Sequence, residues 1–216
     1  MKKSIIFDFD GVILDSLEAK TNAFKTLYSQ YGLKITKKVE AHHLQNGGMS
    51  RFLKIKHYHK EFLNLKLDKE EFNFLLQSFS KLVFNLVINS KFIPGVKIFL
   101  ENNYENYNFF ISTGTPTNEI IEILKKKNIF HYFKDVYGSP ANKKKHIEEI
   151  INKHKIDYKD AFFIGDAKVD FLAASFHKIL FILVTNKHNL SLQNKNIFCI
   201  SDFKKFDINQ VLEFYN

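Results

Sequence analysis

Short apolar runs rich in β-branched and aromatic residues recur along the chain, and such runs predict β-strands. Between these runs, apolar residues recur every three or four positions, which predicts helices with one buried face. The predicted strands are Ser4–Asp8, Asn108–Ser112, Asp135–Tyr137, Ala161–Ile164, Ile179–Val184 and Ile197–Ile200. The predicted helices are Pro94–Asn103, Thr117–Lys127, Lys143–His154 and Val169–Phe176. This alternation favours an α/β fold with an open parallel sheet and helices on both faces.

The segment from residue 15 to residue 92 follows a different pattern. It contains no convincing strand, and its apolar residues have helical spacing, as in Leu75, Leu76, Phe79, Leu82, Val83, Leu86 and Val87. Another helix is predicted at Leu17–Tyr31, where Gly32 is a typical residue to follow a helix end. We therefore expect a helical domain at residues 15–92, inserted into a core made of residues 1–14 and 93–216.

Composition and charge narrow the function classes. The chain has 216 residues, 45% of them hydrophobic, which is enough for a sizeable core. Its 32 Lys and Arg residues exceed its 23 Asp and Glu residues, so the formal net charge is +9. The basic residues are almost all lysine and are spread along the chain. Because Lys, Asn, Ile and Phe share A/T-rich codons, genome composition explains the bias, and we expect no nucleic-acid partner.

Three further features indicate a cytoplasmic protein. Cys199 is the single cysteine, so no internal disulfide can form, and a reducing compartment is the default. No apolar run approaches the ~20 residues that span a bilayer, so we expect no membrane partner. An aspartate interrupts the first apolar stretch too early for a signal peptide. The sequence leaves open whether the protein is a monomer or a homodimer.

Candidate chemistry lies where the predicted strands end, because ligands of open parallel sheets bind at the carboxyl ends of the strands. The first strand ends in Asp8-Phe9-Asp10-Gly11, and the second runs into Thr113-Gly114. The third leads to three successive lysines from Lys143, and the fourth to Asp166, with Asp170 four residues on. Carboxylates gathered at one edge need a cation among them, and hard oxygen ligands beside a substrate phosphate suit Mg²⁺. The hydroxyl and the lysine supply donors for phosphate oxygens.

These segments resemble the haloacid-dehalogenase-like superfamily, in the branch with a helical cap that includes phosphoglycolate phosphatases and β-phosphoglucomutases. The matching segments are FDFDGVILDS, ISTGTP, GSPANKK and FIGDAKVD. The resemblance covers essentially the whole chain and implies a Rossmann-like parallel sheet core with an inserted helical cap domain. It also implies that Asp8 attacks phosphorus and binds Mg²⁺, while Asp10 acts as acid and base and offers its backbone carbonyl to the metal.

The same resemblance implies roles for the other strand ends. Asp166 and Asp170 would bind Mg²⁺, and Thr113, Gly114 and a lysine would hold the phosphoryl oxygens. The spacing after Gly-Ser-Pro favours Lys143 over Lys144 for that lysine.

The second aspartate, Asp10, favours a phosphatase acting on a small phosphorylated metabolite, such as a sugar phosphate. Two alternatives stay open: a sugar-phosphate mutase of the β-phosphoglucomutase type, and a catalytically silent binding protein.

One loop of the predicted cap also stands out. Asn46-Gly47-Gly48-Met49-Ser50-Arg51 combines two glycines with the only arginine in the chain. Gly48 lets the backbone approach a ligand, and Ser50 is suited to cap the helix that follows. A guanidinium binds an anion at two points, whereas lysine offers a point charge. We therefore expect Gly48, Ser50 and Arg51 to set substrate specificity, with Arg51 gripping a substrate anion.

Overall fold

Six parallel strands form one sheet in the computed structural model, which describes residues 2–193 and 196–215. The strands are β1 Ser4–Phe7, β2 Asn108–Pro116, β3 Phe133–Ser139, β4 Ala161–Gly165, β5 Leu180–Val184 and β6 Phe198–Ile200, in the order β3-β2-β1-β4-β5-β6. The predicted α/β fold class is confirmed. The strand β2 continues through the Thr113-Gly114 segment, which the sequence analysis placed after the strand.

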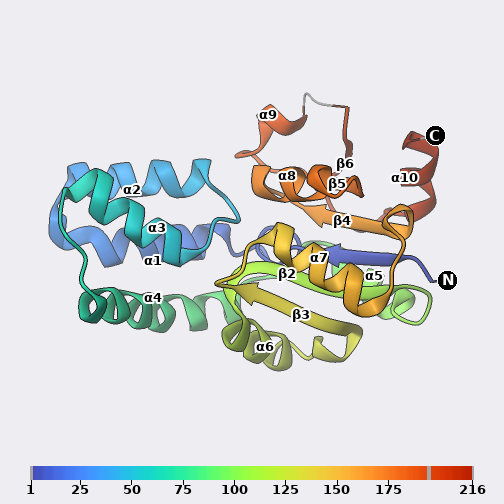
Figure 1. Cartoon of the computed structure of the whole chain (residues 1–216), viewed down its shortest axis with the longest axis horizontal. Coiled ribbons are helices and arrows are strands. Elements are labelled where there is room, and N and C mark those ends of the chain that lie inside the picture. Colours follow the sequence, from blue (N-terminus) through green and yellow to red (C-terminus); the bar gives the residue numbers. More distant parts are fainter. Residues whose placement is uncertain (1, 194–195, 216) are drawn as a thin grey trace.

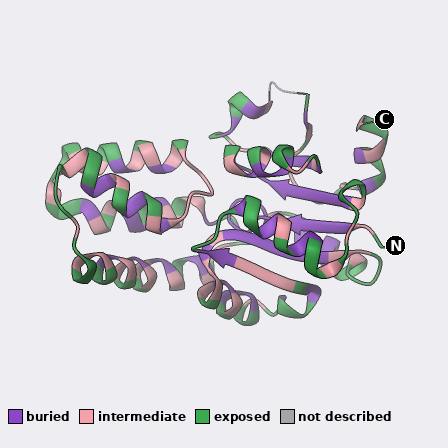
Figure 2. Ribbon diagram, in the orientation of Figure 1, coloured by how far each residue is buried: buried purple, intermediate pink, exposed green. Residues whose placement is uncertain are grey.

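Helices cover both faces of the sheet because successive residues of each strand point to opposite sides. Ile6 of β1 packs in the cluster that contains α7 Lys143–His154 and α8 Lys168–Phe176. Ile5 and Phe7 pack in the larger cluster with α5 Val96–Asn103, α6 Thr117–Lys126 and α10 Ile208–Tyr215. The central strands β1 and β4 are buried along their whole length, whereas the edge strands β3 and β6 are partly exposed (Figure 2). The short helix α9 Leu190–Gln193 follows β5.

Between β1 and α5 the chain forms a group of helices that we call the cap. Its members are α1 Leu17–Tyr28, α2 Leu33–Gln45, α3 Arg51–His57, the π-helical turn Tyr58–Leu63 and α4 Lys69–Asn89. The cap lies beyond the carboxyl ends of the strands, on the left in Figure 1. The two connections lie side by side, since Leu14 and Phe92 form a β-bridge and the Asp15 N–H donates to Lys91 O at 2.9 Å. Because the two connections between the cap and the core are adjacent, they support the proposal that residues 15–92 form a separate domain.

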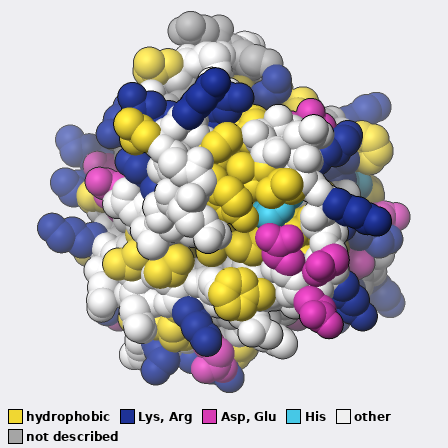
Figure 3. Space-filling model, turned by 90° about the vertical axis from the view of Figure 1, so that its left-hand side faces the viewer, with side chains coloured by type: hydrophobic (Ala, Val, Ile, Leu, Met, Phe, Trp, Pro, Cys, Tyr) yellow, Lys and Arg dark blue, Asp and Glu magenta, His cyan; other side chains and the backbone are white. Residues whose placement is uncertain are grey.

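The surface seen from the cap end carries lysines around its rim and hydrophobic side chains toward its centre, with acidic side chains and a histidine beside them (Figure 3). Among the described helices, none is both long and apolar enough to cross a bilayer.

Candidate active site

The turn that follows β1 places Asp8 and Asp10 at the carboxyl edge of the sheet. The Asp8 N–H donates to Ile164 O at 2.8 Å, which continues the pairing of β1 with β4. Gly11 then adopts φ 78°, and a Cβ there would overlap the Asp166 carboxylate. Glycine is therefore needed both for the left-handed backbone and for the close approach of the two turns. Both aspartates are buried, and Asp8 is 2% exposed.

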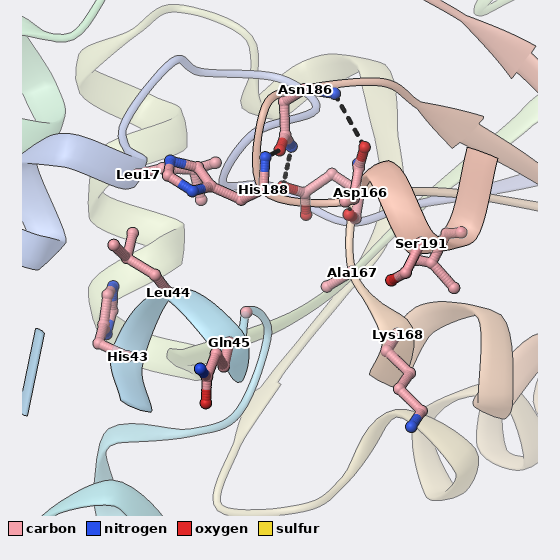
Figure 4. A pocket seen from close by; sticks show the side chains of 13 residues that line it. Leu17, His43, Leu44, Gln45, Asp166, Ala167, Lys168, Asn186, His188 and Ser191 are labelled. Atoms are coloured by element: carbon pink, nitrogen blue, oxygen red, sulfur yellow. Dashed lines mark hydrogen bonds between the residues drawn. The ribbon is translucent and has the colours of Figure 1, made fainter. Parts of the chain in front are cut away.

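The turn after β4 positions two more carboxylates. Asp170 Oδ2 accepts hydrogen bonds from the backbone N–H groups of Asp166, at 3.2 Å, and Ala167, at 3.0 Å. Gly165 is tightly packed against the Asp170 side chain, so a larger residue would displace it. On the far side, Asn186 Nδ2 donates to Asp166 Oδ2 at 3.0 Å, as Figure 4 shows. The backbone and Asn186 thus fix the directions of both carboxylates.

Asp8, Asp166 and Asp170 form a cluster in which one carboxylate oxygen from each lies within 4.8 Å of the others. Burial and the neighbouring carboxylates raise the pKa of Asp8 to about 7, although Lys143 opposes the shift. Burial and Asp8 also raise the pKa of Asp166 well above its usual range. A divalent cation would relieve this repulsion, and three hard oxygen donors in one buried cluster fit Mg²⁺.

Asp10 belongs to the same turn as Asp8 but has different partners. Ser16 Oγ donates to Asp10 Oδ1 at 2.6 Å, and Lys20 Nζ forms an ion pair with Asp10 Oδ2. Lys20 Nζ also donates to Thr115 Oγ1 at 2.8 Å. Burial alone would raise the pKa of Asp10, but Lys20 and Ser16 outweigh it and the pKa is lowered. Two neighbouring carboxylates with opposite pKa shifts are suited to different roles in one reaction.

Lys143 is the lysine that the structure brings to the carboxylates. Its Nζ lies 2.7 Å from Asp8 Oδ2 and also forms an ion pair with Asp170 Oδ1. Burial opposes the charged form, but the two carboxylates hold the pKa of Lys143 above its usual value. Asn142 caps α7, since its side chain accepts from the Lys145 N–H at 3.0 Å. Lys144 is exposed and lies over the Phe176 ring, 4.3 Å from its centroid.

Thr113 and Gly114 lie where the core meets the cap loop. Thr113 is buried, and its Oγ1 accepts from the Thr115 N–H at 3.2 Å. A Cβ on Gly114 would lie 2.7 Å from Gly48 O, so the two backbones are in contact. Gly48 has φ 72°, and a Cβ there would lie 3.5 Å from Lys143 Nζ. The cap loop is thus placed over the carboxylates.

Ser50 and Arg51 differ in their contacts from the sequence-based expectation. Ser50 precedes α3, but its side chain makes no capping hydrogen bond; it lines a cavity together with Thr113 and Lys143. Arg51 is 4% exposed, and its guanidinium donates to both carboxylate oxygens of Glu119, at 2.7 and 2.6 Å. The fork expected to grip a substrate anion therefore holds a carboxylate of the core helix α6.

Arg51 has two further contacts within the cap. It donates to Ser80 Oγ at 2.6 Å and lies over the Phe79 ring, 4.7 Å from its centroid. Its side chain still lines the cavity that contains Asp8 and Asp10.

Several site residues escaped the sequence analysis. Asn186 lies two residues after the end of β5, so the rule that ligands bind at the carboxyl ends of the strands also identifies this residue. Lys20 lies one turn inside the predicted cap helix, where a lysine usually faces solvent, and only the folded chain shows its contact with Asp10. His43 of α2 and Asp166 of the core line one pocket between the cap and the core, as Figure 4 shows.

Comparison with known proteins agrees with the family resemblance of the sequence motifs. A family model described as haloacid dehalogenase-like hydrolase matches residues 5–184. A phosphoglycolate phosphatase of Aliivibrio fischeri is 28% identical over 182 residues, covering 80% of this chain and 79% of that protein. A phosphoglycolate phosphatase of Vibrio parahaemolyticus is 27% identical over 186 residues, covering 80% of this chain and 78% of that protein.

Solved structures share the fold. A β-phosphoglucomutase from Clostridium difficile has a TM-score of 0.78 at 20% identity, covering 100% of this chain and 98% of that chain. A hydrolase from Pseudomonas syringae also has a TM-score of 0.78 at 20% identity, covering 98% of this chain and 99% of that chain.

Proposed function

Because the chain belongs to the haloacid dehalogenase-like hydrolase family, we propose that it is a Mg²⁺-dependent phosphatase that hydrolyses a small phosphomonoester. The substrate is a sugar phosphate or a similarly small metabolite, and the reaction passes through an aspartyl-phosphate. The relatives named phosphoglycolate phosphatase support a small phosphorylated substrate. We also propose a cytoplasmic location.

The observation that carries this proposal is the buried cluster of Asp8, Asp166 and Asp170 with the Lys143 ammonium beside it. The Asp8 carboxylate attacks phosphorus, and the bond from phosphorus to the ester oxygen breaks. Asp10 gives a proton to the leaving alcohol oxygen and afterwards takes a proton from the water that attacks the aspartyl-phosphate. Inorganic phosphate leaves, Asp8 is restored, and Asp10 holds the proton for the next turnover. The Lys20 ion pair favours the ionised Asp10 that activates water.

The remaining residues hold and orient the phosphoryl group. Lys143 and the Thr113 hydroxyl supply donors to its oxygens, where charge must be stabilised during transfer. Asp8, Asp166 and Asp170 would hold Mg²⁺, together with the Asp10 backbone carbonyl. The bound ion supplies positive charge next to the phosphoryl oxygens.

Phosphate release from a panel of phosphorylated metabolites in the presence of Mg²⁺ tests the proposal. Asp8→Asn should abolish turnover and leave the fold intact, since the amide is nearly isosteric with the carboxylate. Asp157→Asn, at an exposed turn, is the matched control and should keep full activity. Isomerised sugar phosphate without net phosphate release would indicate the mutase instead. Activity of Asp8→Asn near that of the wild type, or a silent wild type on every substrate, would overturn the proposal.

A further inference from the structure

Lys54 of α3 is a buried cation with no acidic partner. Its side chain is among the largest that are fully buried, and the residue is 2% exposed. Its Nζ lies 2.9 Å from His43 Nδ1 and 3.3 Å from His43 O. Within residues 2–193 and 196–215, no carboxylate lies at salt-bridge distance from Lys54 Nζ. A histidine ring and a carbonyl are thus its hydrogen-bond partners.

The cavity that Lys54 lines also contains the reacting carboxylates. Asp8 and Asp10 form its core side, and Lys20, Arg51 and Lys54 belong to its cap side. Lys20 is paired with Asp10, and Arg51 is paired with Glu119. Of these three cations, Lys54 is therefore the one without an ion-pair partner in the described chain, although the more distant Asp10 favours its charged form.

An unpaired ammonium is costly to bury, because no protein charge replaces the water that it loses. Burial, reinforced by the charge on Lys20, lowers the pKa of Lys54 to about 7. A methionine of similar length would fill the same space without this cost. The positive charge contributes most when an anion enters the cavity, since the anion then supplies the missing counter-charge.

On the basis of the proposed function, we infer that Lys54 is a specificity-determining residue that binds a second anionic group of the phosphomonoester substrate. Lys54 and Asp8 line the same cavity, so the second anion lies close to the reacting ester, where a carboxylate is the smallest anionic group that a small phosphomonoester can carry. His43 positions the ammonium through Nδ1, so its Nε2 carries the proton of the neutral ring. Burial and the neighbouring Lys54 lower the pKa of His43 to about 2, which keeps the ring neutral.

Two phosphomonoesters of nearly equal size test this assignment. In 2-phosphoglycolate a carboxylate lies one carbon from the ester oxygen, and in 2-hydroxyethyl phosphate a hydroxymethyl group replaces it. The wild type should prefer 2-phosphoglycolate in kcat/KM. Lys54→Met should reduce that preference by about 10- to 100-fold, the range expected for a charge-assisted hydrogen bond, through loss of activity on 2-phosphoglycolate alone. Lys56→Met removes an exposed lysine of the same helix and should leave the preference unchanged.

Two further measurements keep the test decisive. Thermal unfolding of Lys54→Met and Lys54→Gln shows whether each variant is folded, and a ratio unchanged in either folded variant would overturn the inference. If the enzyme prefers ethylene glycol bisphosphate to 2-phosphoglycolate and this preference depends on Lys54, the assignment of a carboxylate as the group that Lys54 binds is overturned. Calorimetric binding of 2-phosphoglycolate to Mg²⁺-loaded Asp8→Asn, with and without Lys54→Met, needs no turnover. It therefore tests Lys54 even when the wild type hydrolyses neither ester, whereas silence of the wild type on the whole panel of phosphorylated metabolites overturns the proposed function instead.

Discussion

Arg51 of the cap and Glu119 of the core form a buried ion pair with two hydrogen bonds, although 68 positions separate them in the sequence. The pair joins α3 to the first turn of α6, and Arg51 also contacts Ser80 of α4. It therefore ties two cap helices to the core beside the cavity that contains Asp8.

Glu119→Gln should weaken this connection. The variant leaves a buried guanidinium without its counter-ion, and breaking such a pair costs about 3–5 kcal/mol when the charge stays buried. Opening of the cap hydrates Arg51 at a lower cost, so we expect a larger radius of gyration in solution scattering rather than unfolding. Glu122→Gln, in the exposed pair with Lys125, is the control and should scatter like the wild type. Unchanged scattering and cap proteolysis in Glu119→Gln would contradict this role.

Asp166→Ala should weaken Mg²⁺ binding, because it removes one of three clustered carboxylates. In the wild type, Mg²⁺ should raise the thermal unfolding temperature, since a ligand of the folded state stabilises it by mass action. The same Mg²⁺ concentration should raise the unfolding temperature of Asp166→Ala by much less. A chelator should reversibly abolish the activity of the wild type. Full activity of the wild type after exhaustive chelation would contradict a Mg²⁺ site at these carboxylates.

Lys20→Met should move the acid limb of the kcat profile to higher pH where attack of water on the aspartyl-phosphate limits turnover, because that step needs ionised Asp10. Without the Lys20 ammonium, burial acts on Asp10 with less opposition, so the pKa of that carboxyl rises. The ionised base then forms only at higher pH. Lys25→Met, on the same helix and paired with Glu40, should leave the profile in place. An acid limb that stays at the wild-type pH in Lys20→Met would show that Asp10 does not control it.

Lys54 should also link stability to pH. Its pKa is about 7 in the folded protein and 10.5 as the ordinary value, so between these values the unfolded chain binds more protons. Its contribution to the free energy of unfolding therefore rises with pH across this window, by a few kcal/mol in total. Chemical denaturation should find Lys54→Met more stable than the wild type near pH 7 and the difference smaller near pH 10. A difference that does not change with pH would refute the linkage.

The periodicity of apolar residues was sufficient to predict the sheet, the helices around it and the helical insertion, because these follow from local burial patterns. Strand ends indicated Asp8, Asp166 and Asp170 as neighbours, since parallel strands end at one edge. The contacts of Arg51 and Lys54 depend on how the cap sits against the core, which no local pattern encodes. The helix end before Gly32 was recognisable from the sequence, whereas nothing local marks Glu119 as the partner of an arginine in the cap.

The contact between Gly114 and Gly48 has a consequence for the spacing of the cap and the core. The hydrogen atom of Gly114 acts as the thinnest possible spacer between the domains, and an alanine there would press its methyl group against the Gly48 carbonyl. Residue size at position 114 thus sets how closely the cap loop can approach β2, and glycine permits the shortest distance between the two backbones.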